Sequence, residues 1–151
     1  MKKPSSKHFA WAGALSLIVG GLAVAQAQPA MADTCPTPGC GGVVRNEASR
    51  ELDVSNCWSG SSGTYVGAFP PCVTIFSQNS YNAAWFVTKG HTSTSLGKYY
   101  YDVDSYQAPA GCVTLGQQSG STFSYDRRGK DAYWIKISSA TKDVIVTAIT
   151  C

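Results

Sequence analysis

The sequence predicts an all-β domain, most simply a small antiparallel β-sandwich stapled by disulfide bonds. Short segments of alternating apolar and polar residues recur along the chain, separated by turn residues. Amphipathic runs with the period of a helix are missing after residue 32. The six cysteines form an even number in a small chain, which is typical of exported disulfide-bonded domains.

The first 32 residues have the organisation of a secretory signal peptide. A basic start is followed by the uncharged, mostly apolar stretch 9–25 and by the small-residue cleavage site Ala30-Met31-Ala32. The basic residues are Lys2, Lys3 and Lys7. We therefore expect a secreted, extracellular domain of residues 33–151 without a membrane span after cleavage; an uncleaved membrane anchor is the alternative.

The expected mature domain carries no net charge. Three of the 12 Lys and Arg residues belong to the signal segment and none of the nine Asp and Glu residues do, which leaves nine of each. This balance excludes a strongly basic nucleic-acid binder, although it does not exclude a local basic patch.

Seven segments have the pattern or composition of strands. In chain order they are 51–58, 73–76, 84–87, 99–103, 122–125, 133–137 and 144–149. We expect the last two to form a hairpin, and 144–149 to be a central strand because it is apolar on both faces. A β-trefoil is the alternative fold, because Pro71–Ile75 resembles Gly111–Leu115 at an offset of 40.

The cysteines are expected to form three disulfides rather than a metal site, because C-x-x-C pairs and neighbouring histidines are missing. Six cysteines allow 15 pairings, among which sequence alone does not choose. The favoured pairs are Cys35–Cys40, Cys57–Cys72 and Cys112–Cys151, with Cys40–Cys57 as the strongest competitor. No metal and no cofactor is expected.

Two groups could support hydrolysis. His91, the only histidine after residue 32, lies among hydroxyl residues, and Asp102 or Asp104 could orient its ring. On a strand, Asp102 and Asp104 would share a face, which suits acid–base work or calcium binding. No serine lies in a nucleophile motif such as G-x-S-x-G, so a solvated histidine and a solvated acidic edge are the simpler interpretations.

The candidate binding residues are aromatic and basic. Tyrosine suits recognition surfaces because it offers a large area and a hydroxyl at low entropic cost, and arginine beside aromatic rings suits anionic ligands. The candidates are Tyr100, Tyr106, Arg127, Arg128 and Trp134. Ordinary strand residues and a charged turn are the alternative interpretations. The expected partner is an extracellular protein or a cell-wall polymer.

Two loops next to cysteines are further candidates. Residues 36–39 lie between Cys35 and Cys40, and Phe69-Pro70-Pro71 precedes Cys72. Proline and disulfide constraints order a loop before it meets a partner and so lower the cost of binding, as in protein inhibitors of proteases. A stapled N-terminus and an ordinary turn are the alternatives.

The export signal, the start Gly39-Cys40-Gly41-Gly42 and the segments 102–112 and 125–130 resemble those of small secreted proteins of actinobacteria, a group without an assigned function. The resemblance implies an exported, disulfide-bonded β domain and assigns no site residues. We expect a non-enzymatic binding or inhibitory protein. A small secreted hydrolase using His91 or the Asp102/Asp104 pair, and a surface component of the cell envelope, are the alternatives.

Overall fold

The computed structural model describes residues 35–138 and 141–151, so the expected signal peptide and its cleavage site lie outside the described residues. The described chain is all-β, as predicted, with ten strands and two short 3-10 helices. The strands are β1 (Val43–Asn46), β2 (Leu52–Ser55), β3 (Thr64–Val66), β4 (Ile75–Phe76), β5 (Ala83–Val87), β6 (Ser105–Ala108), β7 (Val113–Gln118), β8 (Ser121–Asp126), β9 (Tyr133–Lys136) and β10 (Asp143–Thr150). The 3-10 helices are η1 (Ser93–Leu96) and η2 (Lys98–Tyr100). Within these ranges no helix is long and apolar enough to cross a membrane.

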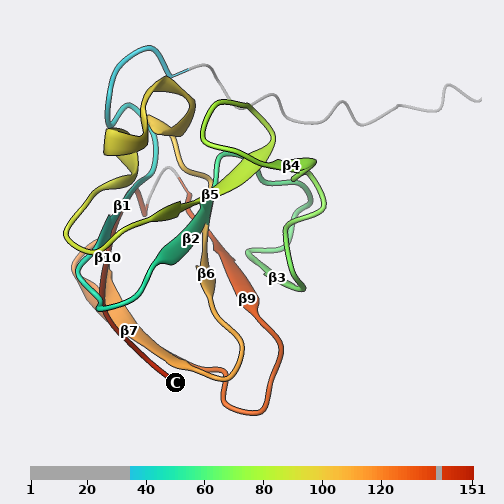
Figure 1. Cartoon of the computed structure of the whole chain (residues 1–151), viewed down its shortest axis with the longest axis vertical. Helices are drawn as coiled ribbons and strands as arrows, with labels where there is room; N and C mark the ends of the chain where they lie inside the picture. The colour runs from blue at the N-terminus through green and yellow to red at the C-terminus, as the bar shows by residue number, and fades with distance from the viewer. Residues whose placement is uncertain (1–34, 139–140) are drawn as a thin grey trace, which may run out of the picture.

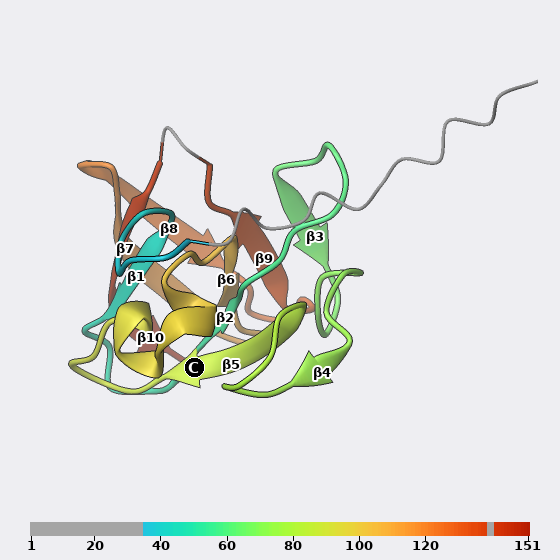
Figure 2. The ribbon, with the colours of Figure 1, turned by 90° about the horizontal axis from the view of Figure 1, so that it is seen from above.

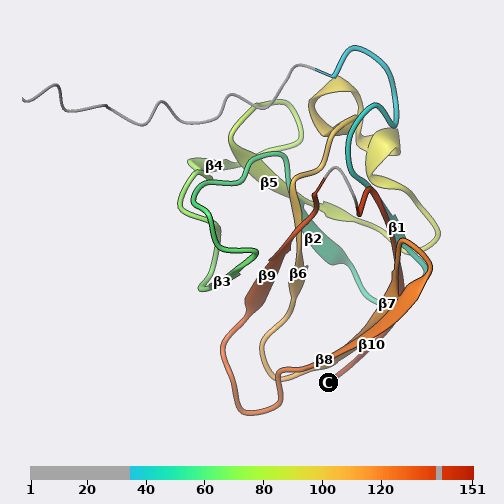
Figure 3. The ribbon, with the colours of Figure 1, turned by 180° about the vertical axis from the view of Figure 1, so that it is seen from behind.

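The strands form two sheets, which Figures 1 and 3 show from opposite sides and Figure 2 from above. One sheet has the strand order β1-β10-β7-β8, and the other has the order β3-β9-β6-β2-β5-β4. The pairs β1–β10 and β4–β5 are parallel and all others are antiparallel, so each sheet is mixed rather than purely antiparallel. Two open sheets also exclude the β-trefoil alternative for the described residues, since a trefoil requires a closed barrel.

The core lies between the two sheets. Val44 and Val146 contribute from the four-stranded sheet, and Val54, Tyr106 and Ile135 from the six-stranded sheet. Burial alternates along the first half of β10, with Val144 and Val146 buried, and the alternation changes phase after Val146, where the register with β7 shifts, so that Ile149 is the next buried residue. Each fully buried aliphatic side chain of this kind contributes about 1.5–3 kcal/mol relative to an exposed one. The expected burial of Ile135 and Val146 is therefore confirmed.

The position of β10 confirms one expectation and contradicts another. β10 lies between β1 and β7, so the apolar segment 144–149 is a central strand as predicted. The predicted hairpin of 133–137 with 144–149 is wrong, because β9 pairs with β3 and β6 in the other sheet. The connection between β9 and β10 crosses from one sheet to the other. The sequence of a short polar connection does not show whether it joins the two strands of a hairpin or leads to a strand of the other sheet.

Two further strand predictions need correction. Residues 99–103 are not a strand: η2 ends at Tyr100, and Gly97, with φ 97°, separates η1 from η2. The positive φ favours glycine because a Cβ is poorly tolerated there. Of the predicted strand 73–76, only Ile75 and Phe76 are in β4, at the outer edge of the six-stranded sheet, and both are exposed.

All three favoured disulfides are present: Cys35–Cys40, Cys57–Cys72 and Cys112–Cys151. Their sequence separations are 5, 15 and 39 residues. The last one joins the start of β7 to the end of β10, two strands that already pair. Three disulfides are typical of a protein that folds in an oxidising compartment.

Candidate functional site

Four aromatic rings gather beside β4 at the edge of the six-stranded sheet. This aromatic cluster consists of Phe69, Phe76, Trp85 and Phe86. Ring centroids lie 5.9 Å apart for Phe69–Phe76, 4.8 Å for Phe76–Trp85 and 4.7 Å for Trp85–Phe86. Phe69 is 38% exposed, Phe76 44% and the neighbouring Ile75 50%. Exposed apolar side chains in a contiguous group mark interaction sites more often than the same side chains scattered singly.

The position of Phe69 follows from the path of the chain. β3 and β4 are the two outer strands of their sheet, and residues 67–74 connect them. Phe69 lies on this connection, between the buried Trp134 of β9 at 6.1 Å and Phe76 of β4. Below the connection, Trp58, Ala84 and Trp134 form a second, smaller core with Val73 packed against it. Phe69 is thus supported from beneath while its outer side stays accessible.

Hydrogen bonds hold the connection in place. The carbonyl oxygen of Ala68 accepts hydrogen bonds from Nε1 of Trp134 at 3.0 Å and from Nε2 of Gln107 at 3.2 Å. The backbone amide of Gly67 donates to the carbonyl oxygen of Ala132 at 3.2 Å. The two residues before Phe69 are therefore hydrogen-bonded to strands of the sheet or to a connection between strands.

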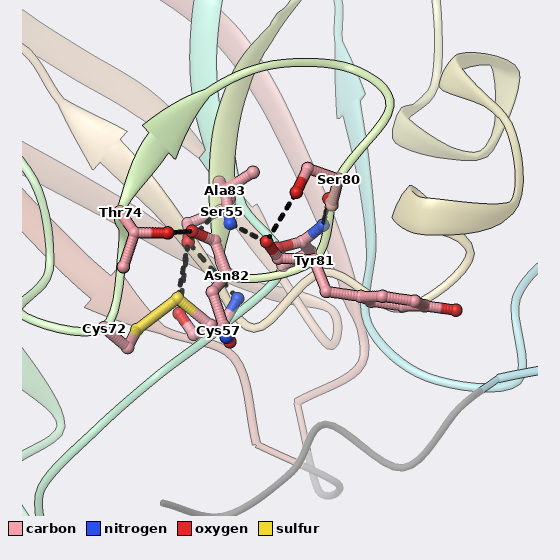
Figure 4. Close-up of a disulfide and its surroundings, with 9 residues drawn as sticks. Ser55, Cys57, Cys72, Thr74, Ser80, Tyr81, Asn82 and Ala83 are labelled. Carbon is pink, nitrogen blue, oxygen red and sulfur yellow. Dashed lines mark hydrogen bonds between the residues drawn. A yellow bond between two sulfur atoms is a disulfide. The ribbon is translucent and has the colours of Figure 1, made fainter.

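The Cys57–Cys72 disulfide ties the other end of the connection, and Figure 4 shows its surroundings. Two residues after Cys72, the amide and the hydroxyl of Thr74 donate to the carbonyl oxygen of Asn82 at 2.8 and 3.3 Å. On the other side of the disulfide, the Ser55 hydroxyl donates to the carbonyl oxygen of Ala83 at 3.2 Å. These contacts order the ring-bearing segment before any ligand arrives, which lowers the entropic cost of binding.

Three of the five predicted binding residues lie in the interior. Tyr100, Tyr106 and Trp134 are fully buried, so they cannot form a surface, and the expectation of exposed rings at these positions is corrected. The Tyr100 hydroxyl donates to the carbonyl oxygen of Ser77, and the Tyr106 hydroxyl donates to Oε1 of Gln118. Burial raises the pKa of both phenols. Residue type alone does not show where these tyrosines lie, because tyrosine suits both a core and a recognition surface.

Arg127 and Arg128 lie on the turn between β8 and β9, in agreement with the alternative interpretation of a charged turn. The Arg128 guanidinium forms an ion pair with Asp126 at 2.6 Å, and this contact holds the pKa of the Asp126 carboxyl well below its usual range. The Arg127 guanidinium lies 4.9 Å from the centroid of the Tyr133 ring and donates to the carbonyl oxygen of Asp131. Figures 1 and 3 place this turn at the opposite end of the molecule from β4. The structure does not bring these arginines to the aromatic cluster.

Asp102 and Asp104 are brought together, although not on a strand as predicted. They line a pocket of about 250 Å³ with the Cys35–Cys40 disulfide, Gly41, Gly42 and Lys142 among its walls. The Gly42 amide donates to Oδ1 of Asp102 at 2.7 Å, and a Cβ at Gly41 would overlap the same carboxylate. Asp102 thus holds the glycine pair in place. Burial, together with the charge of Asp102, raises the pKa of Asp104 to about 6.

His91 does not line the Asp102/Asp104 pocket. Its ring is exposed, and Nδ1 lies 3.0 Å from both the Thr88 hydroxyl and the Lys89 carbonyl oxygen. The catalytic arrangement in which an aspartate orients His91 is therefore not formed in the described structure. Across residues 35–138 and 141–151, no group of three or more His, Cys, Asp and Glu side chains is placed to hold a metal ion.

The aromatic cluster was largely missed by sequence reasoning. The sequence predicts strands at 73–76 and 84–87 but not which of their side chains are exposed, because an apolar run looks the same in the middle of a sheet and at its edge. Only Phe69 was singled out, through its place before two prolines and Cys72.

Comparisons with protein-family models, curated proteins and solved structures find no match for this chain.

Proposed function

We propose that the protein is a secreted, non-enzymatic binding protein that recognises its ligand through the aromatic cluster. The observation that carries the proposal is the exposure of Phe69 and Phe76 on a segment already fixed by the Cys57–Cys72 disulfide and by hydrogen bonds to the sheet. Leaving these rings in water lowers the stability of the free domain relative to burying them, a cost that ligand contact removes.

The preorganised rings offer area for binding but no group that could act as a base or nucleophile. Aromatic anchors held in one conformation dominate the energetics of many interfaces because they bury a large area at little entropic cost. Hydrolysis instead needs a base, a nucleophile or metal, and a group that stabilises developing charge. His91 does not line the Asp102/Asp104 pocket, so the histidine and the two aspartates do not form one catalytic site that would support the hydrolase alternative.

The test compares three forms of the protein. The wild type, the double variant Phe69→Ala/Phe76→Ala and the control Leu115→Ala are immobilised and exposed to extracellular proteins and to cell-wall polymers. Leu115 is a matched control because it is 41% exposed on β7 of the other sheet. We expect the wild type and Leu115→Ala to retain the same ligand and the double variant to lose it. Equal retention by all three, or an activity abolished by His91→Ala, contradicts the proposal.

A further inference from the structure

The segment that carries the aromatic cluster has no charged side chain. Between Asp53 and Lys89 the sequence contains no Lys, Arg, Asp, Glu or His. Nucleic acids, anionic lipid surfaces and anionic polymers are bound largely by Lys and Arg, which this segment lacks. The lack of Lys and Arg therefore argues against an anionic ligand on the rings, although Arg50, Glu51 and Asp53 lie just before this segment.

Polar groups lie beside the rings on the same sheet. The strand register places Asp53 of β2 opposite Phe86 of β5, and Gln107 of β6 opposite Trp134 of β9. Residues opposite one another on neighbouring strands project from the same face. Asp53 and Gln107 together line a pocket of about 80 Å³, whose walls also include Arg50 and Glu51.

Both polar side chains retain hydrogen-bonding capacity. Among the described residues, the Asp53 carboxylate has no hydrogen-bond or ion-pair partner, and burial raises its pKa. Gln107 uses Nε2 for Ala68, and its Oε1 has no partner in the described part of the chain. An ionised carboxylate acts only as an acceptor, and an amide oxygen also accepts, so both can accept a hydrogen bond from a hydroxyl group.

A sugar ring matches this combination. Its two faces present C–H groups that pack against aromatic rings, while its edge carries hydroxyl groups that donate to carboxylate and amide oxygens. The pocket is too small for a whole sugar ring, so it would receive hydroxyl groups at the edge of a chain that lies across the rings. Binding sites commonly combine an apolar lining with a few polar groups that fix orientation.

From the uncharged segment, the exposed rings and the adjacent acceptors, we propose that the ligand is a neutral polysaccharide. The chain packs against Phe76 and Phe86 and donates hydroxyl hydrogen bonds to Asp53 and Gln107. This inference rests on the proposed function, because it names the ligand class of the same surface.

The test measures co-sedimentation with microcrystalline cellulose and with chitin, both neutral, and with the anionic polysaccharide pectate in an insoluble form. We expect the wild type to bind at least one neutral polymer. The affinity should change little between about 0.05 and 0.5 M salt, because an uncharged polymer forms no ion pairs with the protein that salt could screen. Phe76→Ala should weaken binding about tenfold, and Leu115→Ala should leave it unchanged. Asp53→Ala should also weaken binding, and Asp53→Asn should retain part of it, because the amide oxygen still accepts a hydrogen bond.

The outcomes separate this inference from the proposed function. If the wild type binds only pectate, or binds no polysaccharide, the assignment of a neutral glycan is wrong. If it binds an extracellular protein in a Phe76-dependent manner instead, the binding surface stands and only the ligand class fails. If cellulose or chitin binding is unaffected by Phe69→Ala, Phe76→Ala and Asp53→Ala, both the surface and the inference are overturned. Circular dichroism of each variant establishes that it is folded.

Discussion

The indole of Trp134 donates a hydrogen bond to the carbonyl oxygen of Ala68, at 3.0 Å, from a strand 66 residues away in the sequence. The bond joins β9 to the connection that presents Phe69, whose ring lies 6.1 Å from that of Trp134. A residue predicted to contact a ligand directly is therefore a buried support for a residue that is exposed.

The first prediction concerns this support. Trp134→Phe keeps an aromatic ring but removes the donor to Ala68, which should lower the free energy of unfolding by about 1–2 kcal/mol. It should also increase amide hydrogen exchange across residues 67–73. Trp58→Phe is the matched control, since Nε1 of Trp58 donates to Ser62 and its ring lies in the same small core. Unchanged exchange of 67–73 in Trp134→Phe would show that the connection is held without this bond.

The second prediction concerns pH. The pKa of Asp104 is raised to about 6 in the folded protein, mainly by burial, whereas an unfolded aspartate titrates near 3.9. The folded state therefore holds this proton more tightly, and the Asp104 contribution to stability declines as pH rises from about 4 to about 6.

Asp104→Asn removes this ionisation and should raise the free energy of unfolding above pH 6, by about 1–2 kcal/mol after allowing for partial exposure. The gain should disappear below about pH 4, where the wild-type carboxyl is protonated in both states. Urea denaturation at pH 3.5, 5 and 7.5 measures the effect. Asp131→Asn, on the exposed β8–β9 turn, serves as control. A gain that is equal at all pH values would rule out Asp104 ionisation as its cause.

The third prediction concerns the Cys57–Cys72 disulfide. Cys57→Ser/Cys72→Ser should lower the free energy of unfolding by about 3 kcal/mol, the value expected for a loop of this length when the unfolded chain is no longer constrained. The Cys35–Cys40 disulfide closes a shorter loop, so Cys35→Ser/Cys40→Ser should lower the free energy of unfolding by less. Thermal unfolding of both variants tests this order. A larger loss in the Cys35/Cys40 variant would contradict it.

The fourth prediction concerns the core between the sheets. Ile135→Ala should destabilise the protein by about 2–5 kcal/mol, because Ile135 is buried in a core whose members come from both sheets. Leu115→Ala, at an exposed apolar position, should change stability by no more than about 0.5 kcal/mol. Chemical denaturation of both variants measures the difference. Similar small losses in the two variants would place Ile135 outside the cooperative core.

The fold was predictable where it depends on local pattern. Alternation identified the strand around Val54, and a run that is apolar on both faces identified the central strand around Val146. The favoured cysteine pairs are the observed ones, although the sequence alone does not choose among the 15 possible pairings. Strand partners were not predictable, because the apolar pattern of β9 or β10 shows which faces are buried but not which neighbouring strand pairs with it. Residues 99–103 were mistaken for a strand since the β propensity of tyrosine depends on context, and here the buried Tyr100 anchors a 3-10 turn.

The candidate site was less predictable than the fold. Exposure of Phe76 results from the end of the sheet at β4, and strand order is a property of the whole fold rather than of residues 73–76. Phe69 could be found because proline and cysteine mark a constrained loop locally. No local sequence feature marks Asp53 as a site residue, because its position beside Phe86 depends on the register between β2 and β5.

The parallel pairing of β1 with β10 has a consequence for the kinetics of folding. It joins Val43 to Asp143, so a long stretch of chain must be brought to closure before this pair forms. Proteins dominated by such distant contacts fold slowly, because the entropy of closure is lost before the contacts compensate for it. The β2–β5 and β7–β8 pairs join nearer segments and can form earlier. We therefore expect the addition of β1 to be among the last steps of folding, with the edge of β10 open to other chains until then.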